Sequence, residues 1–210
     1  MQQKNQDVKF YKVVVFINAL VPLALLAWDA VSGRLGANPI EFAIRTTGFL
    51  ALIFLFVTLA ITPLRKWTKI SELVKYRRML GLFAFFYAAL HLSIYFAIDR
   101  NLNLANTAGD IVQRPFVAVG MTAFFLLIPL AVTSTNSMIK RLGGKRWQQL
   151  HKLTYLCAVG GVIHYYLIVK SDVLMPLAFA AVLIFLLGYR IYAANQTPVK
   201  TLVVPKQSKS

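Results

Sequence analysis

The chain has 210 residues, of which 58% are hydrophobic and 14% are charged. Water-soluble domains average about 45–50% apolar and about 25% charged residues, so this composition excludes an ordinary soluble enzyme. In a soluble protein the net charge of +16 would indicate a nucleic-acid partner, whereas in so apolar a chain it indicates basic connections beside a lipid bilayer. One cysteine, Cys157, excludes an internal disulfide and an iron–sulfur cluster bound by cysteines of this chain.

Six stretches in chain order are predicted to cross a membrane. A helix needs about 20 mostly apolar residues to cross about 30 Å of hydrocarbon. The predicted spans cover residues 13–28, 47–64, 80–98, 116–133, 147–169 and 173–192. Their apolar residues surround the helix instead of forming one stripe, which is typical of helices buried in lipid. The sequence therefore predicts an all-α integral membrane bundle of six transmembrane helices.

The basic residues predict how this bundle is oriented. Most of the 23 Lys and Arg residues fall before the first span, in 65–78, in 140–152 and after the last span, whereas 29–46 and 99–114 carry few. Basic connections face the cytoplasm, so both termini are predicted to be cytoplasmic in the bacterial inner membrane. We divide the chain into a cytoplasmic N-terminus (1–12), one transmembrane domain (13–192) and a basic cytoplasmic tail (193–210).

Two of the three histidines lie deep inside predicted spans, where ionisable residues are costly and usually functional. His91 is eight residues before Asp99 and His164 six before Lys170, which places both at a similar depth, roughly 9–12 Å below the outer boundary. Two imidazoles at one depth can bind a haem iron from both sides. The alternative is that each histidine is hydrogen-bonded to a neighbouring helix, but the matched depth favours haem.

A third histidine lies nearer the cytoplasmic end. His151 precedes His164 by thirteen residues, about 20 Å along a helix, and Arg77 and Arg78 reach the same depth on the third span. One histidine and two arginines suit an anionic group, such as a flavin phosphate or a haem propionate, better than a second haem with two histidine ligands. The alternative for Arg77 and Arg78 is an ordinary basic flank. On a straight helix, moreover, His151 and His164 would point about 140° apart.

Several stretches resemble a known family. They are RRMLGLFAFFYAALHLSIY (77–95), RPFVAVG (114–120), TSTNSMIKRLGGKRWQQLHKLTYLCAVGGVIHYY (133–166) and TGFLALIFLFVTLAITPLR (47–65). Together they resemble the MsrQ family, the haem-binding membrane subunits of bacterial periplasmic methionine-sulfoxide reductases, within the wider ferric-reductase-like transmembrane group. The resemblance covers nearly the whole chain.

This resemblance implies a function. A membrane subunit of this kind takes electrons from the quinone pool or a cytoplasmic flavin reductase. It passes them through haem b to a periplasmic molybdopterin-containing catalytic subunit that reduces methionine sulfoxide in oxidised proteins. By the resemblance, His91 and His164 match the outer haem ligands, His151 matches the inner histidine, and FMN is an expected cofactor. The wider group has a fourth histidine where Arg77 lies here, so we expect one haem b and a flavin or quinone site.

Two other classes of function remain open from the sequence. A self-standing transmembrane ferric reductase would use the same haem without a partner, and a transporter would use the histidines as proton relays. We find no nucleophile with an adjacent base, so the chain is expected to transfer electrons and to leave the sulfur chemistry to its partner. The connections 29–46 and 99–114, with Arg100, Asp110 and Arg114, are the predicted docking surface for that partner.

Overall fold

The computed structural model describes residues 2–169 and 171–196, and every regular element within them is helical. The predicted basic tail lies outside these residues from residue 197 onward. In chain order the elements are α1 (Gln2–Val31), α2 (Pro39–Thr68), η1 (Ser71–Leu73), α3 (Val74–Ile94), η2 (Tyr95–Asp99), α4 (Leu104–Gln113), α5 (Pro115–Val132), α6 (Asn136–Leu142), α7 (Gly144–Leu150), α8 (Leu153–Ile168) and α9 (Leu174–Asn195). The all-α prediction is confirmed for this part of the chain.

Local sequence explains where the long helices begin and end. Asn38 caps α2 by accepting a hydrogen bond from the Glu41 backbone N–H at 3.2 Å, and Pro39 takes the first helical position, where its missing N–H costs nothing. The helix ends at Lys69, whose φ of 59° lies in the left-handed region. Pro115 begins α5 in the same way that Pro39 begins α2. These signals fix the first residues of α2 and α5.

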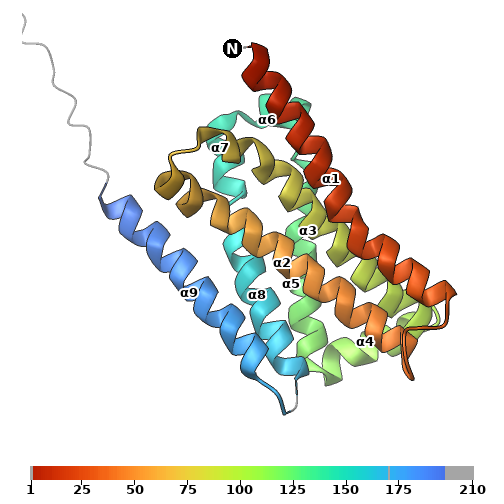
Figure 1. The fold of residues 1–210 in the computed structure, drawn as a ribbon. Helices are drawn as coiled ribbons and strands as arrows, with labels where there is room; N and C mark the ends of the chain where they lie inside the picture. The colour runs from red at the N-terminus through yellow and green to blue at the C-terminus, as the bar shows by residue number, and fades with distance from the viewer. Residues whose placement is uncertain (1, 170, 197–210) are drawn as a thin grey trace, which may run out of the picture.

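Four helices form the centre of the molecule. The main packed pairs are α2 with α3 and α5 with α8, and the two pairs also meet where α3 contacts α5 and α2 contacts α8. Consequently α3 and α8 stand at opposite corners of a four-helix arrangement. Around it, α1 lies along α3 and α2 on one side, and α9 lies beside α8 and α2 on the other (Figure 1).

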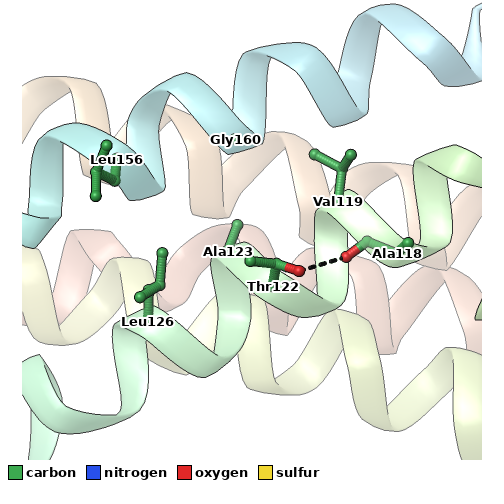
Figure 2. Close-up of a pocket in the computed structure, with 7 residues that line it drawn as sticks. All are labelled: Ala118, Val119, Thr122, Ala123, Leu126, Leu156 and Gly160. Atoms are coloured by element: carbon green, nitrogen blue, oxygen red, sulfur yellow. Dashed lines mark hydrogen bonds between the residues drawn. The ribbon is translucent and has the colours of Figure 1, made fainter.

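Close contacts between small and aromatic residues hold these pairs together. A stack of aromatic rings joins α2 to α3, with Phe54 and Tyr87 nearly parallel at 5.4 Å between centroids. In the other pair Gly160 on α8 faces Ala123 on α5, and a Cβ at Gly160 would lie only 3.1 Å from the Ala123 Cβ. Small residues that allow backbones to approach are typical of helix pairs in membranes. A shallow groove of about 230 Å³ runs along this pair beside Gly160 and Thr122 (Figure 2).

Five of the described helical segments are long and apolar enough to cross a membrane. They are Gln6–Val31, Pro39–Thr68, Ser71–Asp99, Pro115–Val132 and Leu174–Asn195. Large apolar side chains on their outer faces are exposed, for example Leu25 at 58% and Ile184 at 72%. These segments match five of the six predicted spans; the first three are longer at both ends, and the other two differ from the prediction by one to three residues at each end.

The remaining predicted span, 147–169, is the fifth in chain order, and it is not one continuous helix. It is divided into α7 and α8 by a turn at His151 and Lys152, and α8 has only 16 residues, about 24 Å of rise. The prediction of an unbroken helix here was wrong. The six-span topology itself stays a prediction.

The two ends of the bundle differ in charge. Figure 1 shows the start of α1, the α2–α3 connection, α6, α7 and the end of α9 at one end, and the α1–α2 connection, α4 and the α8–α9 connection at the other. The first end carries the basic segments 65–78 and 140–152, and we call it the basic end. Its cytoplasmic location remains a prediction.

Candidate haem site between two histidines

His91 on α3 and His164 on α8 meet at the centre of the four-helix arrangement. Their ring centroids are 6.0 Å apart and the rings are nearly perpendicular, at 89°. The two helices occupy opposite corners, so the imidazoles approach each other from opposite sides. The sequence-based expectation that the two histidines lie at the same depth and face each other agrees with this geometry.

Each imidazole is fixed by a backbone carbonyl of the neighbouring helix. His91 Nδ1 lies 2.9 Å from the Ile44 carbonyl oxygen on α2, and His164 Nδ1 lies 2.6 Å from the Phe116 carbonyl oxygen on α5. A carbonyl can only accept, so each Nδ1 must carry the proton and donate it. Each Nε2 is then unprotonated and can bind a metal ion.

A glycine makes room for each of these bonds. Gly48 lies four residues after Ile44, and Gly120 lies four residues after Phe116, so each glycine is one helical turn beyond the accepting carbonyl. A Cβ at Gly48 would lie 2.9 Å from His91 Nδ1, and a Cβ at Gly120 would lie 2.6 Å from His164 Nδ1. Any side chain at either position would push the imidazole away from its acceptor. The same arrangement of carbonyl, glycine and histidine thus occurs twice.

The spacing of the two rings fits an iron atom between them. An imidazole nitrogen binds a metal at about 2 Å and lies about 1 Å from its ring centre, so two opposed ligands place their ring centres about 6 Å apart. The measured centroid separation is 6.0 Å. Within the described residues, no group of three or more His, Cys, Asp or Glu side chains could hold a metal ion. The residues present therefore fit a haem iron bound by two imidazoles.

His151 lies apart from this pair, in the turn between α7 and α8. Its ring stacks on Trp147 at 3.9 Å between centroids, and its Nδ1 donates to the Trp147 carbonyl oxygen at 3.0 Å. Burial lowers the pKa of His151 and the nearby charge of Arg77 lowers it further, while the carbonyls of Trp147 and Leu130 oppose this shift. Because the chain turns at His151, the 140° separation expected on a straight helix does not apply.

The two predicted arginines have different surroundings. Arg78 is exposed and donates to the Asn136 side-chain oxygen at the start of α6. Arg77 is partly buried near the start of α3. The structure directs Arg78 toward α6, and the grouping of Arg77 with His151 stays a prediction.

Sequence reasoning missed Gly48, Gly120 and Arg190. The two glycines carried a signal, because each lies in a span of otherwise larger apolar residues, but glycines in membrane helices commonly serve helix packing. Arg190 was counted only as part of the basic flank. The sequence feature that could have indicated its role is Pro63. Because Pro63 has no N–H, the Leu59 carbonyl lacks its usual donor within the helix, and Arg190 donates to it at 2.8 Å instead.

The predicted docking connection 99–114 is more ordered than expected, because it contains α4. Asp110, 8% exposed, pairs with Arg100 at 2.7 Å and with Arg114 at 3.1 Å, and it accepts from the Tyr95 hydroxyl at 2.6 Å. The three charges that we expected to face a partner are therefore used within the chain, where they hold η2, α4 and α5 together. Charge reversal at these residues would disturb the fold, so it cannot test docking.

Comparisons with known proteins show which family the chain belongs to. Residues 47–162 match the family model described as ferric reductase like transmembrane component, a range that contains His91 and His151 and ends just before His164. A relative from Herminiimonas arsenicoxydans is 49% identical over 187 residues, 88% of this chain and 86% of the relative. One from Caulobacter vibrioides is 46% identical over 198 residues, 94% of each chain.

Both relatives are named protein-methionine-sulfoxide reductase heme-binding subunit MsrQ. A third relative, the magnetosome protein MamZ of Magnetospirillum gryphiswaldense, is 44% identical over 188 residues, which are 87% of this chain but 29% of MamZ. The apolar helices and these matches identify a multi-pass membrane protein. The chain belongs to the ferric-reductase-like transmembrane family and, within it, to the MsrQ haem-binding subunits of protein-methionine-sulfoxide reductase.

Proposed function

We propose that this chain is the electron-transfer subunit that carries electrons across the bacterial inner membrane to a periplasmic, molybdopterin-containing methionine-sulfoxide reductase. The observation that carries the proposal is the pair of opposed imidazoles, 6.0 Å apart, with both Nδ1 atoms bonded to backbone carbonyls. This arrangement leaves one Nε2 on each side for a single iron. It belongs to a chain whose relatives are named heme-binding subunits.

His91 and His164 would hold a haem b, which when bound supplies one-electron oxidation and reduction at its iron. The Ile44 and Phe116 carbonyls keep both imidazoles in the tautomer that exposes Nε2, and they increase the basicity of the ligands. Two histidine ligands leave no open position on the iron, so the chain itself would not bind a substrate there. These residues therefore position and tune an electron carrier.

The basic end is the proposed entry point for electrons, supplied by the quinone pool or by a cytoplasmic flavin reductase. Arg77, His151 and Arg78 are the residues we proposed from the sequence for an FMN or quinone site. Two observations support an anionic ligand there: Arg77 is partly buried near the start of α3, and the His151 ring stacks on Trp147 at 3.9 Å between centroids. A guanidinium recognises a phosphate well, and an aromatic pair offers a surface for a flavin ring.

The opposite end is the proposed exit toward the periplasmic catalytic subunit. The single thiol of the chain, Cys157, is 1% exposed inside the helix bundle, where a protein substrate cannot reach it. The chemistry is therefore assigned to a partner, and this chain acts as a non-catalytic subunit. The printed name of the relatives, a heme-binding subunit of a reductase, supports this division of work.

Absorption spectra of the detergent-purified protein test the haem assignment. In oxidised and dithionite-reduced samples we expect a low-spin b-type spectrum that is lost in His91→Ala and in His164→Ala, because each removes one axial ligand. We expect His151→Ala to retain most of the spectrum, because this ring lies on Trp147 and not opposite the other two. His151→Ala is thus the matched control for loss of an imidazole.

Three results would contradict the proposal. A colourless wild-type protein from haem-replete cells would indicate that the histidines serve helix packing or proton transfer instead of haem binding. Haem that persists in both His91→Ala and His164→Ala would place the ligands elsewhere. Rapid reduction of a ferric chelate by the purified chain alone, without a partner, would favour the self-standing ferric reductase.

A further inference from the structure

The first helix, α1, carries a row of exposed residues on the side that faces away from the bundle. The helix lies against α3 and α2 at the edge of the molecule, and its inner face buries Val8, Ala19 and Leu26 (Figure 1). A second row, about 120° around the helix, is exposed throughout and has alternating spacings of three and four residues. We call it the α1 stripe, and it consists of Tyr11, Val14, Asn18, Val21, Leu25 and Trp28.

Asn18 places a polar side chain of this stripe inside the membrane. Tyr11 and Trp28 lie 17 residues apart, about 26 Å along the helix, and such aromatic residues are typical of the two membrane interfaces. Asn18 lies about 10 Å inward from Tyr11. One amide N–H of Asn18 donates to the Val14 carbonyl oxygen at 2.8 Å. Its other N–H and its Oδ1 have no hydrogen-bond partner among residues 2–169 and 171–196.

An amide with unpaired groups is costly in hydrocarbon, because lipid tails offer no hydrogen bond. Pro22 adds to this cost, since it has no N–H for the Asn18 backbone carbonyl four residues earlier. Polar residues inside a membrane span usually have a partner for this reason. The described residues leave the stripe exposed, so we expect the partner of Asn18 to belong to another molecule in the membrane.

We propose that the α1 stripe is the surface through which two copies of this chain pair, with their two Asn18 amides hydrogen-bonded to each other. Copies of one chain insert in the same orientation, so the two α1 helices run parallel and both Asn18 residues lie at the same depth. An amide both donates and accepts, so the free N–H of each Asn18 can donate to the Oδ1 of the other. A two-fold axis along the membrane normal forms both bonds at once.

The spacing of the stripe supports this pairing. Alternating steps of three and four residues make a seven-residue repeat, which keeps one face of each helix against its partner in a left-handed pair. A single Asn in such a repeat fixes the register and the number of helices. The apolar side chains of Val14, Val21 and Leu25 would pack on either side of the Asn18 pair. His91 and His164 belong to other helices, so the pairing does not depend on the proposed haem site.

Cysteine cross-linking of the full-length protein in native membranes tests this contact. The single native thiol, Cys157, is 1% exposed, so an introduced cysteine is the one that reacts. We expect Val14→Cys to form a disulfide-linked dimer under a mild oxidant. Val13→Cys is the matched control, because Val13 has nearly the same depth and is more exposed, at 57% against 36%, but points about 100° away.

Sedimentation of the purified protein in mild detergent tests the role of Asn18. We expect Asn18→Leu to raise the dissociation constant of the dimer about tenfold, the effect of losing a hydrogen-bonded amide pair in a membrane. Asn18→Gln keeps the amide, so it should retain most of the dimer. Because Asn18 is exposed to lipid, neither substitution should change the visible spectrum of the protein.

Several results would overturn the proposal. One is a Val14→Cys protein that cross-links no more than Val13→Cys, and another is a wild-type protein that stays monomeric at every concentration tested. Equal dissociation constants for the wild type and Asn18→Leu would show that the amide has no role in pairing. A cross-link from Val14→Cys to a different protein would assign the stripe to another membrane helix. Cross-linking needs no haem, so its outcome is independent of the proposed function.

Discussion

Replacing Gly120 by alanine gives the sharpest test of how the two-histidine site is held. The added Cβ would lie 2.6 Å from His164 Nδ1 and 2.7 Å from its Cε1, whereas ordinary contacts begin near 3.4 Å. The ring must therefore retreat by about 0.8 Å, the difference between 3.4 and 2.6 Å. A retreat of that size lengthens the 2.6 Å bond to the Phe116 carbonyl beyond the usual limit of roughly 3.2 Å.

The lost bond changes the reduction potential in a known direction. An Nδ1–H bonded to a carbonyl makes the imidazole a more basic ligand, which favours ferric iron. A neutral hydrogen bond contributes about 0.5–1.5 kcal/mol, and 1.4 kcal/mol corresponds to about 59 mV for a one-electron couple. We therefore expect Gly120→Ala to raise the midpoint potential by tens of millivolts, up to about 60 mV.

A spectroscopic redox titration of the reduced haem band measures this shift. Gly188→Ala on α9 is the matched control, because a Cβ there meets nothing within 4 Å. Gly48→Ala, with a less severe approach of 2.9 Å to His91 Nδ1, should shift the potential in the same direction by a smaller amount. An unchanged potential in Gly120→Ala with haem retained would refute the claim that the carbonyl bond tunes the iron.

Two further predictions concern stability. Tyr87→Phe removes the 2.6 Å hydrogen bond from the buried Tyr87 hydroxyl to the Ala19 carbonyl. We expect the free energy of unfolding to fall by about 1–2 kcal/mol and the melting temperature in detergent to fall with it. An unchanged melting temperature would show that this bond does not stabilise the fold. Asp110→Asn removes the charge that pairs with both Arg100 and Arg114. We therefore expect amide hydrogen exchange to become faster in α4 and to stay the same in α2. Equal protection of α4 in the wild type and the variant would contradict the role assigned to this carboxylate.

The positions of His91 and His164 could be predicted because an ionisable side chain in an apolar span is rare enough to stand out. Counting residues along each span gave their common depth. What the sequence could not supply was the partner of each Nδ1, because the Ile44 and Phe116 carbonyls are backbone atoms present at every residue. Only the pairing of α2 with α3 and of α5 with α8 selects them.

The turn at His151 shows a different limit. Apolar content predicted one helix through 147–169, and the residues in this range that most weaken a helix are Gly160 and Gly161. Instead those glycines lie within α8, where they let Ala123 and Leu52 approach, and the chain turns where Trp147 stacks on His151. Hydropathy measures transfer into lipid and carries no information about such a local ring contact.

The duplicated arrangement of carbonyl, glycine and histidine also has a consequence for synthesis. One copy is complete within α2 and α3, and the other needs α5 and α8, which leave the ribosome later. The first hairpin can therefore insert and orient His91 while the rest of the chain is still being made. The second proposed iron ligand, His164, is available only after residue 164 has been translated, so we expect haem binding to be among the last steps of biosynthesis.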